Sequence, residues 1–323
     1  MTPWRHETLA TLGGVAAGAA AGWWLARAAD TSLDDILYWD DIPRRPGKPA
    51  LDGEHVVGIL PDTQHYAATH PQIYATQTGW LSGAVDYVLH LGDLVDDAAS
   101  RGEWNRVSDA HGILDRSETP YGVCGGDHDT LDDRDVVEYM TGPWHHYRRV
   151  FPLERLDGDG ASVVASRGGS RNYAHLVDLG DRRLLVLFLS WPTGDGYPLA
   201  WAHRVLEAYA DTPTVLVTHS YLRADGSWSG HGEALAVLPA THEQVVLAVG
   251  GHHLTRGRPF VVHRNRVCQG LLVNAQNVPP SGGAGWLCTL SLDGDRARLE
   301  TYSPHHEAVP RRTVAYSRDL RMG

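Results

Sequence analysis

Five apolar segments of the chain are each followed by a side chain that can bind a metal ion. These side chains are Asp62, Asp93, Asp127, His219 and His252, with gaps of 31, 34, 92 and 33 residues between them. Carboxylate oxygens and imidazole nitrogens together suit divalent manganese, iron, zinc or nickel. A single aspartate after a strand is as easily explained as a helix N-cap. Five metal-binding side chains in equivalent places favour a metal site instead.

We expect these five segments to be strands whose carboxyl ends meet. They lie at 55–60, 86–91, 121–124, 214–218 and 245–249. Further strand candidates are 173–178, 184–190, 260–263, 267–273 and 286–292, and helical patterns lie near 71–84, 101–116, 132–140, 199–210 and 232–238. The early alternation of strands and helices predicts a parallel sheet, to which the later strands add antiparallel neighbours. In open α/β sheets ligands bind in a crevice at the carboxyl ends of the strands, so the five side chains would converge there.

The first residues have the composition of an export segment. An uncharged apolar stretch, 9–25, follows Arg5 and His6 and precedes the sequence Ala-Arg-Ala at 26–28. This pattern predicts that 1–29 is a secretory signal peptide or, if uncleaved, a membrane anchor, and that the protein is exported. Polar residues 30–54 are expected to form a linker, 55–304 one domain, and 305–323 a tail that adds an edge strand or stays loose.

The overall charge and the cysteines limit the partners. A formal net charge of −11 argues against a nucleic-acid groove, which needs a cationic surface. The 19 histidines are many for 323 residues and favour metal binding without locating it. Cys268 and Cys288 flank a loop and could pair in an oxidising compartment. The alternative is that they and Cys124 are three buried thiols.

Short motifs around these residues resemble those of the calcineurin-like metallophosphoesterase superfamily. They are, in order, "PDTQ" at 61–64, "QTGW" at 77–80, "HLGDLVD" at 90–96, "GGDHD" at 125–129, "THSYL" at 218–222, "GHHL" at 251–254 and "TYSP" at 301–304. The closer resemblance is to a bacterial branch that opens with the "PDTQ" motif, and it covers residues 55–304. It implies a four-layer α-β-β-α sandwich of two mixed sheets that holds one or two divalent metal ions.

The resemblance also implies roles for individual residues. Asp93 would bridge two ions. One ion would be completed by Asp127, His219 and His252, and the other by Asp62 and Gln64. His128 would stabilise the transition state or protonate the leaving oxygen, and Asp96 would orient it. The implied reaction is hydrolysis of a phosphomonoester or phosphodiester outside the cytoplasm, by attack of a metal-bound hydroxide on phosphorus.

Two departures from the family pattern support a different function. Gln64 stands where the family has a histidine, and Leu254 replaces the last histidine of the "GHxH" motif. A local shift could bring His253 or His65 into the gap. The alternative function is therefore a degenerate domain with an incomplete metal site, acting as a binding or structural part of a cell-envelope assembly.

Other residues near the predicted crevice have simpler explanations. His90 is expected to be a packed core residue, and tryptophans such as Trp104 and Trp191 are expected to lie in the core. His231 and Tyr221 flank the crevice, where they would be either solvated or in contact with substrate.

Overall fold

The computed structural model describes most of the chain after residue 54. The described residues are 55–131, 142–193, 196–255, 260–264, 268–276, 284–294, 296–305 and 317–321. The predicted export segment, the linker and the predicted helix at 132–140 lie outside them, and the domain boundaries stay predictions. Within the described ranges, every helix is too short or too polar to cross a membrane.

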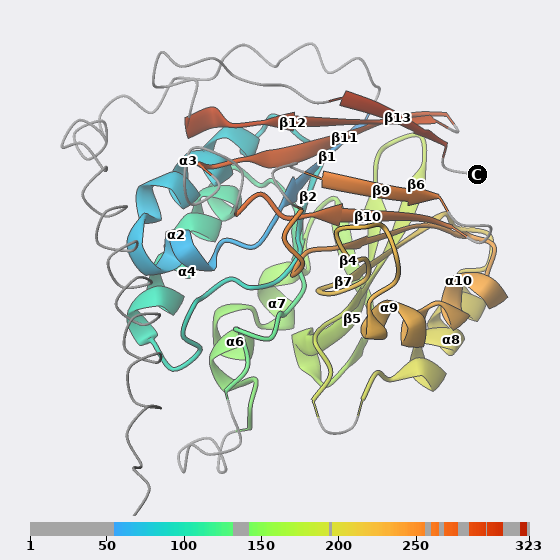
Figure 1. The fold of residues 1–323 in the computed structure, drawn as a ribbon, viewed down its shortest axis with the longest axis horizontal. Helices are drawn as coiled ribbons and strands as arrows, with labels where there is room; N and C mark the ends of the chain where they lie inside the picture. Colours follow the sequence, from blue (N-terminus) through green and yellow to red (C-terminus); the bar gives the residue numbers. More distant parts are fainter. Residues whose placement is uncertain are drawn as a thin grey trace, which may run out of the picture. The chain divides into compact units, whose positions relative to one another are not determined.

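The first sheet has six strands and is mixed (Figure 1). Its strands are β1 (His55–Leu60), β2 (Tyr87–His90), β3 (Tyr121–Val123), β11 (Leu287–Asp293), β12 (Arg296–Tyr302) and β13 (Ser317–Arg321), in the order β13-β12-β11-β1-β2-β3. β1, β2 and β3 are parallel, and the other neighbours are antiparallel. β13 is an edge strand, which is one of the two alternatives that the sequence left open for the tail.

The second sheet has seven strands and is also mixed. Its strands are β4 (Ala161–Arg167), β5 (Asn172–Asp178), β6 (Arg183–Leu189), β7 (Thr214–Thr218), β8 (Val245–Gly250), β9 (Phe260–Arg264) and β10 (Gln269–Val273), in the order β4-β5-β6-β7-β8-β10-β9. The four strands from β6 to β10 in this order are parallel. The predicted pair of mixed sheets is therefore confirmed.

Helices flank both sheets. They are α2 (Gln64–Thr69), α3 (Pro71–Leu81), α4 (Arg101–Arg116), α6 (His145–Val150), α7 (Leu153–Leu156), α8 (Leu199–Ala208), α9 (Gly230–Leu235) and α10 (Val237–Thr241), with a 3₁₀ turn, η2, at Gly169–Arg171. The predicted helix at 232–238 is divided at Ala236 into α9 and α10. Leu206, Leu235 and Leu238 of α8–α10 share a buried cluster with Leu187 and Leu216 of the seven-stranded sheet.

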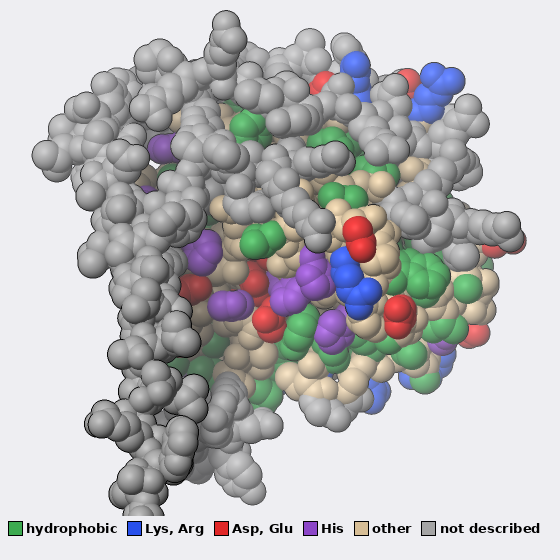
Figure 2. Space-filling view, in the orientation of Figure 1, with side chains coloured by type: hydrophobic (Ala, Val, Ile, Leu, Met, Phe, Trp, Pro, Cys, Tyr) green, Lys and Arg blue, Asp and Glu red, His purple; other side chains and the backbone are tan. Residues whose placement is uncertain are grey.

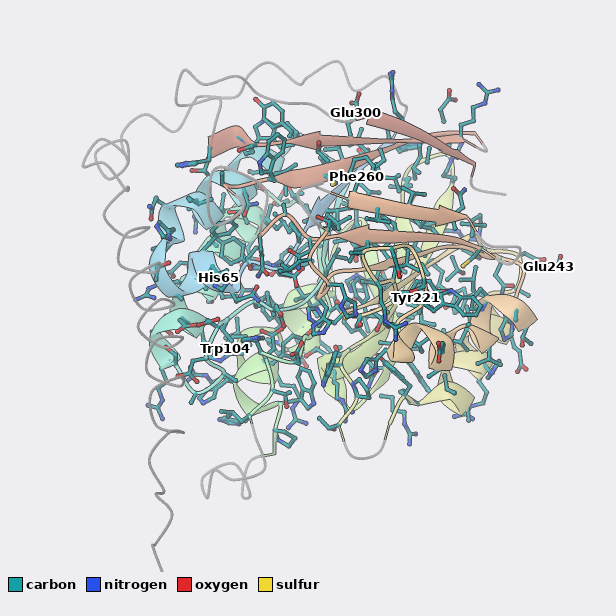
Figure 3. The ribbon with its side chains drawn as sticks, in the orientation of Figure 1. His65, Trp104, Tyr221, Glu243, Phe260 and Glu300 are labelled. Carbon is teal, nitrogen blue, oxygen red and sulfur yellow. The ribbon has the colours of Figure 1, made fainter. Side chains whose placement is uncertain are left out.

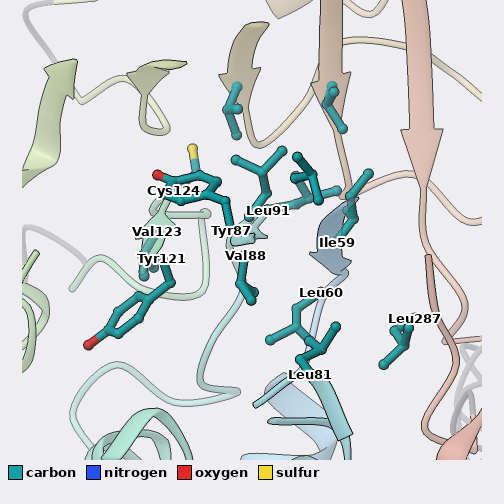
Figure 4. Close-up of a cluster of buried hydrophobic side chains, with 14 of the residues drawn as sticks. Ile59, Leu60, Leu81, Tyr87, Val88, Leu91, Tyr121, Val123, Cys124 and Leu287 are labelled. Carbon is teal, nitrogen blue, oxygen red and sulfur yellow. The ribbon is translucent and has the colours of Figure 1, made fainter. Parts of the chain in front are cut away.

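The main core combines residues of both sheets. Strand residues alternate between two faces, and Figure 4 shows Ile59 and Leu60 pointing to opposite sides of β1. Val57 and Ile59 share one buried cluster with Phe188 and Val217 of the other sheet. Burying a side chain of this size contributes roughly 1.5–3 kcal/mol, so the layered packing fixes how the strand ends lie.

The cysteines are buried and free. Cys288 lies in β11 of the six-stranded sheet, whereas Cys268 precedes β10 of the seven-stranded sheet, and Cys124 follows β3. Of the two alternatives from the sequence, the structure has the three buried thiols.

Candidate metal centre

Four of the predicted ligands come together at the ends of four strands. Asp93 and Asp127 follow β2 and β3, and His219 and His252 follow β7 and β8. Each offers one ligand atom, and the four atoms lie within 4.8 Å of one another. We call this group the histidine position. On the face shown in Figure 2, histidine side chains gather beside acidic ones.

The contacts within the histidine position suit a cation. His219 Nε2 lies 3.1 Å from Asp93 Oδ1 and 3.1 Å from Asp127 Oδ1. His252 Nδ1 lies 3.0 Å from Asp127 Oδ1. Among the described residues neither His219 Nε2 nor Asp127 Oδ1 has a partner with hydrogen-bond geometry, although both atoms are buried. Buried polar atoms normally have partners, so these atoms fit a divalent ion placed between them.

The hydrogen bonding of His219 prepares it as a ligand. Its Nδ1 lies 2.8 Å from the carbonyl oxygen of Leu91, to which it donates. In the neutral ring, the form that binds a metal ion, the lone pair of Nε2 then faces the carboxylates of Asp93 and Asp127. A histidine that is oriented through its second nitrogen is the usual arrangement at metal sites.

The charges around His219 also favour a cation. Burial lowers the pKa of His219, but Asp93, Asp127 and Asp62 outweigh burial and raise this pKa well above 6.5. Burial raises the pKa of Asp62 to about 7, with Asp93 adding to the rise and His219 opposing it. Three carboxylates gathered out of water thus create a field that a metal ion neutralises.

The second predicted position contains only oxygen donors. We call Asp62, Gln64 and the shared Asp93 the oxygen position. Asp62 Oδ1 accepts a hydrogen bond of 2.8 Å from the main-chain N–H of His252, and Gln64 Nε2 donates to Asp93 Oδ2 at 3.0 Å. Asp62 Oδ2 and Gln64 Oε1 are buried and have no hydrogen-bond partner among the described residues. Both are acceptors that suit a hard cation.

Among the described residues, no further imidazole joins the four-residue group that forms the histidine position. His253 Nε2 lies 3.4 Å from Ser220 Oγ, and His65 Nδ1, on α2 (Figure 3), lies 3.8 Å from Asp96 Oδ1. Leu254 is 49% exposed. The structure therefore brings together Asp93, Asp127, His219 and His252, sets Asp62 and Gln64 beside Asp93, and leaves His253 outside the four.

His128 lies next to the metal ligands and is held by the main chain of Asp96. Its N–H donates to Asp93 Oδ1 at 3.2 Å, and its Nδ1 lies 2.9 Å from the Asp96 carbonyl oxygen. The carboxylate of Asp96 is farther away, with Oδ1 at 3.8 Å. Burial lowers the pKa of His128, but the Asp96 carbonyl and the charges of Asp93 and Asp127 raise it above 6.5 overall. The catalytic roles of His128 and Asp96 stay predictions.

Asp129 is a supporting residue to which the sequence gave no role. Its Oδ2 accepts from the N–H of Gly126 at 2.7 Å, and its Oδ1 accepts from Leu94 at 2.8 Å and Val95 at 3.2 Å. The buried carboxylate thus joins the loop that carries Asp127 to the loop that follows Asp93. Its place as the last acid of "GGDHD" was the only trace of this role in the sequence.

His90 is a core residue, as predicted, and it also connects two loops. Its Nδ1 accepts from the N–H of Gly92 at 3.2 Å, and its Nε2 lies 3.0 Å from Thr63 Oγ1. Burial lowers the pKa of His90 well below 6.5, so the ring is neutral and donates one bond while accepting the other. The turns before Asp93 and after Asp62 are therefore held at a fixed separation.

Two of the four non-glycine residues with positive φ in the described part of the chain are candidate metal ligands. Asp93 has a φ of 51° and His252 a φ of 65°, which non-glycine residues rarely adopt. Such strain costs on the order of 1–3 kcal/mol per residue and clusters at functional sites. A Cβ on Gly126 would collide with Asp93 Oδ1, and one on Gly251 would collide with Asp62 Oδ2. Glycine is required at both places for the carboxylates to sit where they do.

Three aromatic residues named in the sequence analysis differ in how deeply they are buried. Tyr221 is fully buried, with its hydroxyl 3.8 Å from Cys268 Sγ, so it belongs to the core (Figure 3). Trp104 is also buried, as predicted. Trp191 is partly exposed, and its ring centroid lies 5.2 Å from that of His252 and 6.0 Å from that of His219. Trp191 therefore packs at the edge of the main core rather than inside it.

Comparisons with known proteins identify the class to which this fold and site belong. The model of the calcineurin-like phosphoesterase family matches residues 56–256, and the chain belongs to this family. The family implies a metal-dependent hydrolase of phosphoesters. The solved structure of purple acid phosphatase PPD1 from yellow lupin (Lupinus luteus) seeds has 15% sequence identity and a TM-score of 0.53. The match covers 81% of this chain and 53% of that one, and it supports the fold.

Two further similarities are to a curated protein and to a solved structure. The uncharacterized protein YvnB of Bacillus subtilis (strain 168) is 29% identical over 294 residues, which are 84% of this chain. The chain spans about a fifth of the length of that curated relative, 21%. Vacuolar Protein Sorting 29 from Cryptosporidium parvum has 12% identity and a TM-score of 0.39, with 83% of this chain and 98% of that one covered. A similarity this low carries no inference about partners.

Proposed function

We propose that the protein hydrolyses phosphomonoesters or phosphodiesters with divalent ions held at the histidine position and the oxygen position. The observation that carries the proposal is the convergence of Asp93, Asp127, His219 and His252 within 4.8 Å. Two of their buried atoms have no hydrogen-bond partner in the described part of the chain.

The residues around the centre would have different roles in the reaction. Ions bound there would supply Lewis acidity and an activated water, as divalent ions do in phosphoryl transfer. Asp93 belongs to both positions and sets their separation. His128 donates its Nδ1 proton to the Asp96 carbonyl, which leaves Nε2 as the nitrogen that protonates the leaving oxygen.

The proposal includes a location outside the cytoplasm. Its support is the apolar stretch at 9–25 with Arg5 before it and Ala-Arg-Ala at 26–28. Mass spectrometry of the protein recovered from its native host is the test. A mature N-terminus near residue 29 in an exported fraction is expected for a cleaved signal, and an intact N-terminus in the membrane fraction is expected for an anchor. Intact protein confined to the cytoplasm would refute export.

Metal content and turnover test the hydrolase directly. Purified protein is loaded with manganese, iron, zinc or nickel, dialysed, and assayed on an aryl phosphomonoester and an aryl phosphodiester. Bound metal together with turnover that Asp93→Asn removes supports the proposal. The matched control is Asp109→Asn, because Asp109 is an exposed acid on α4. Absence of turnover with every ion would refute it.

A second candidate is a binding domain that keeps one ion and has no turnover. Two observations favour it. Leu254 is exposed and offers no ligand atom, and Gln64 Nε2 donates a hydrogen bond to Asp93 Oδ2, an atom that a second ion would need. One bound ion, no turnover and unchanged stability of Gln64→Ala would support this candidate over the hydrolase.

A further inference from the structure

Three aromatic rings form a continuous surface beside the histidine position. The ring centroids of Trp191 and His231 are 4.2 Å apart, and those of Tyr197 and His231 are 5.8 Å apart with the planes at 89°. The Trp191 ring also lies 5.2 Å from the ring of His252. We call Trp191, His231 and Tyr197 the aromatic wall.

Hydrogen bonds fix the aromatic wall to the loops that carry metal ligands. The main-chain N–H of Trp191 donates to the carbonyl oxygen of Gly125 at 2.8 Å, and Gly125 lies two residues before Asp127. The Tyr197 hydroxyl lies 3.3 Å from the Oγ1 of Thr218, the residue before His219. The wall therefore keeps a constant position relative to the ligands, as a binding surface must if it is to discriminate between substrates.

The wall is partly open to solvent and carries no charge near neutral pH. All three side chains are partly exposed, in contrast to the fully buried Tyr221. Burial lowers the pKa of His231, and the neighbouring His252 and His219 lower it further. A neutral imidazole and two uncharged rings offer no positive charge to a phosphate group. They favour contact with a flat apolar group instead.

We propose that the aromatic wall binds a planar aromatic group on the alcohol side of the phosphate ester. The proposal rests on the proposed function, because the phosphate group must bind at the metal ligands for the rest of the ester to reach the wall. In an aryl ester the ring follows the bridging oxygen directly, so it lies close to the ions. The short distance from Trp191 to His252 and His219 matches such a ligand.

Two phosphonates that cannot be hydrolysed distinguish the contribution of the aromatic wall to ligand affinity from the contribution of the ions. Binding of phenylphosphonate and methylphosphonate to the manganese-loaded protein is measured by calorimetry, in wild type and in Trp191→Leu. We expect wild type to prefer phenylphosphonate by about 10-fold. We expect Trp191→Leu to remove this preference by weakening phenylphosphonate alone. Equal weakening of both ligands, or no change, would overturn the proposal.

Matched variants control for damage to the fold. Trp201→Leu removes a partly buried tryptophan of α8 that packs on the outer core and should leave both affinities unchanged. Trp191→Phe keeps a ring and should retain most of the preference. If Trp191→Leu does not fold, His231→Ala replaces it and should reduce the preference several-fold. Loss of the preference in Trp201→Leu would count against the wall.

The outcomes for the wall and for the hydrolase are distinguishable. Binding of phenylphosphonate that depends on Trp191, in a protein without turnover, would leave the wall standing and refute the proposed function. Turnover of aryl and alkyl phosphates with equal KM would support the hydrolase and refute the wall. If both proposals are right, Trp191→Leu raises KM for phenyl phosphate about 10-fold and leaves kcat nearly unchanged.

Discussion

The two positions that share Asp93 are built from different donor atoms. The histidine position has two imidazoles and two carboxylates, and its atoms lie close together around His219 Nε2. The oxygen position has one further carboxylate and the amide of Gln64. This amide donates a hydrogen bond from Nε2 to Asp93 Oδ2. Imidazole binds borderline ions such as zinc and iron, whereas oxygen donors suit harder ions such as manganese or magnesium. From this difference we predict that the proposed centre would hold one ion firmly and exchange the other.

The largest effect is expected where the two positions overlap. Asp93→Asn removes the charge shared by both, so we expect loss of the firmly held ion and a fall in turnover of at least ~1000-fold. Metal analysis after dialysis and initial rates on an aryl phosphate measure this. Asp109→Asn should behave as wild type. Retention of both metal and activity in Asp93→Asn would show that Asp93 belongs to neither position.

The next prediction contrasts one residue from each position. His219→Ala should release the firmly held ion during dialysis, with affinity reduced ~100-fold or more, because it removes a buried nitrogen ligand. Gln64→Ala should keep that ion, because the side-chain hydrogen bond of Gln64 in the described part of the chain is its donation to Asp93 Oδ2. Calorimetric titration of metal-free protein compares the two variants. Similar losses in both would break the distinction between the positions.

The Asp129→Asn variant tests how much the hydrogen bonds of Asp129 contribute to metal affinity at the histidine position. Asp129→Asn places an NH₂ group opposite one of three N–H donors. We expect metal affinity to fall ~10–100-fold, as for other residues that orient ligands, together with a loss of about 1–3 kcal/mol in folding stability. The affinity comes from metal titration and the stability from urea unfolding of metal-free protein. Unchanged affinity with lower stability would make Asp129 purely structural.

The smallest effect is a gain of function at the oxygen position. Gln64→His combined with Leu254→His restores the imidazoles of the family pattern, so we expect the second ion to bind ~10-fold more tightly. The number of ions retained per chain should rise from one toward two. Gln64→Asn is the matched control, since it keeps an amide. If wild type already retains two ions, the two positions do not differ as their donors indicate.

Much of the fold could be predicted because its central strands are simple in sequence. β7 was predicted at its observed bounds, since "TVLVT" is an apolar run between turn residues. β12 was missed because "RARLETY" alternates charged and apolar residues at a sheet surface. α2 was missed because six residues are too few to show a helical period. Strands that are buried on both faces are thus recognisable, whereas exposed or short elements depend on their neighbours.

For the candidate metal centre, the sequence predicts which residue types are present but not the contacts that they make. The ligands Asp93, Asp127, His219 and His252 stand out because each ends an apolar run. The hydrogen bonds of Asp129 join it to residues 34 and 35 positions away, which no local pattern shows. Asp96 reaches His128 with its carbonyl oxygen rather than its carboxylate. Such details are set by how the two sheets pack.

The origin of the ligands has a mechanical consequence. Asp93 and Asp127 follow strands of the six-stranded sheet, whereas His219 and His252 follow strands of the seven-stranded sheet. An ion at the histidine position would therefore act as a cross-link between the sheets and close the long stretch of chain from Asp93 to His252. Because the ion would bind the folded protein and not the unfolded chain, it would stabilise the fold and hold the two groups of strand ends together. Metal binding would then add to the packing of the shared core, which already joins the two sheets.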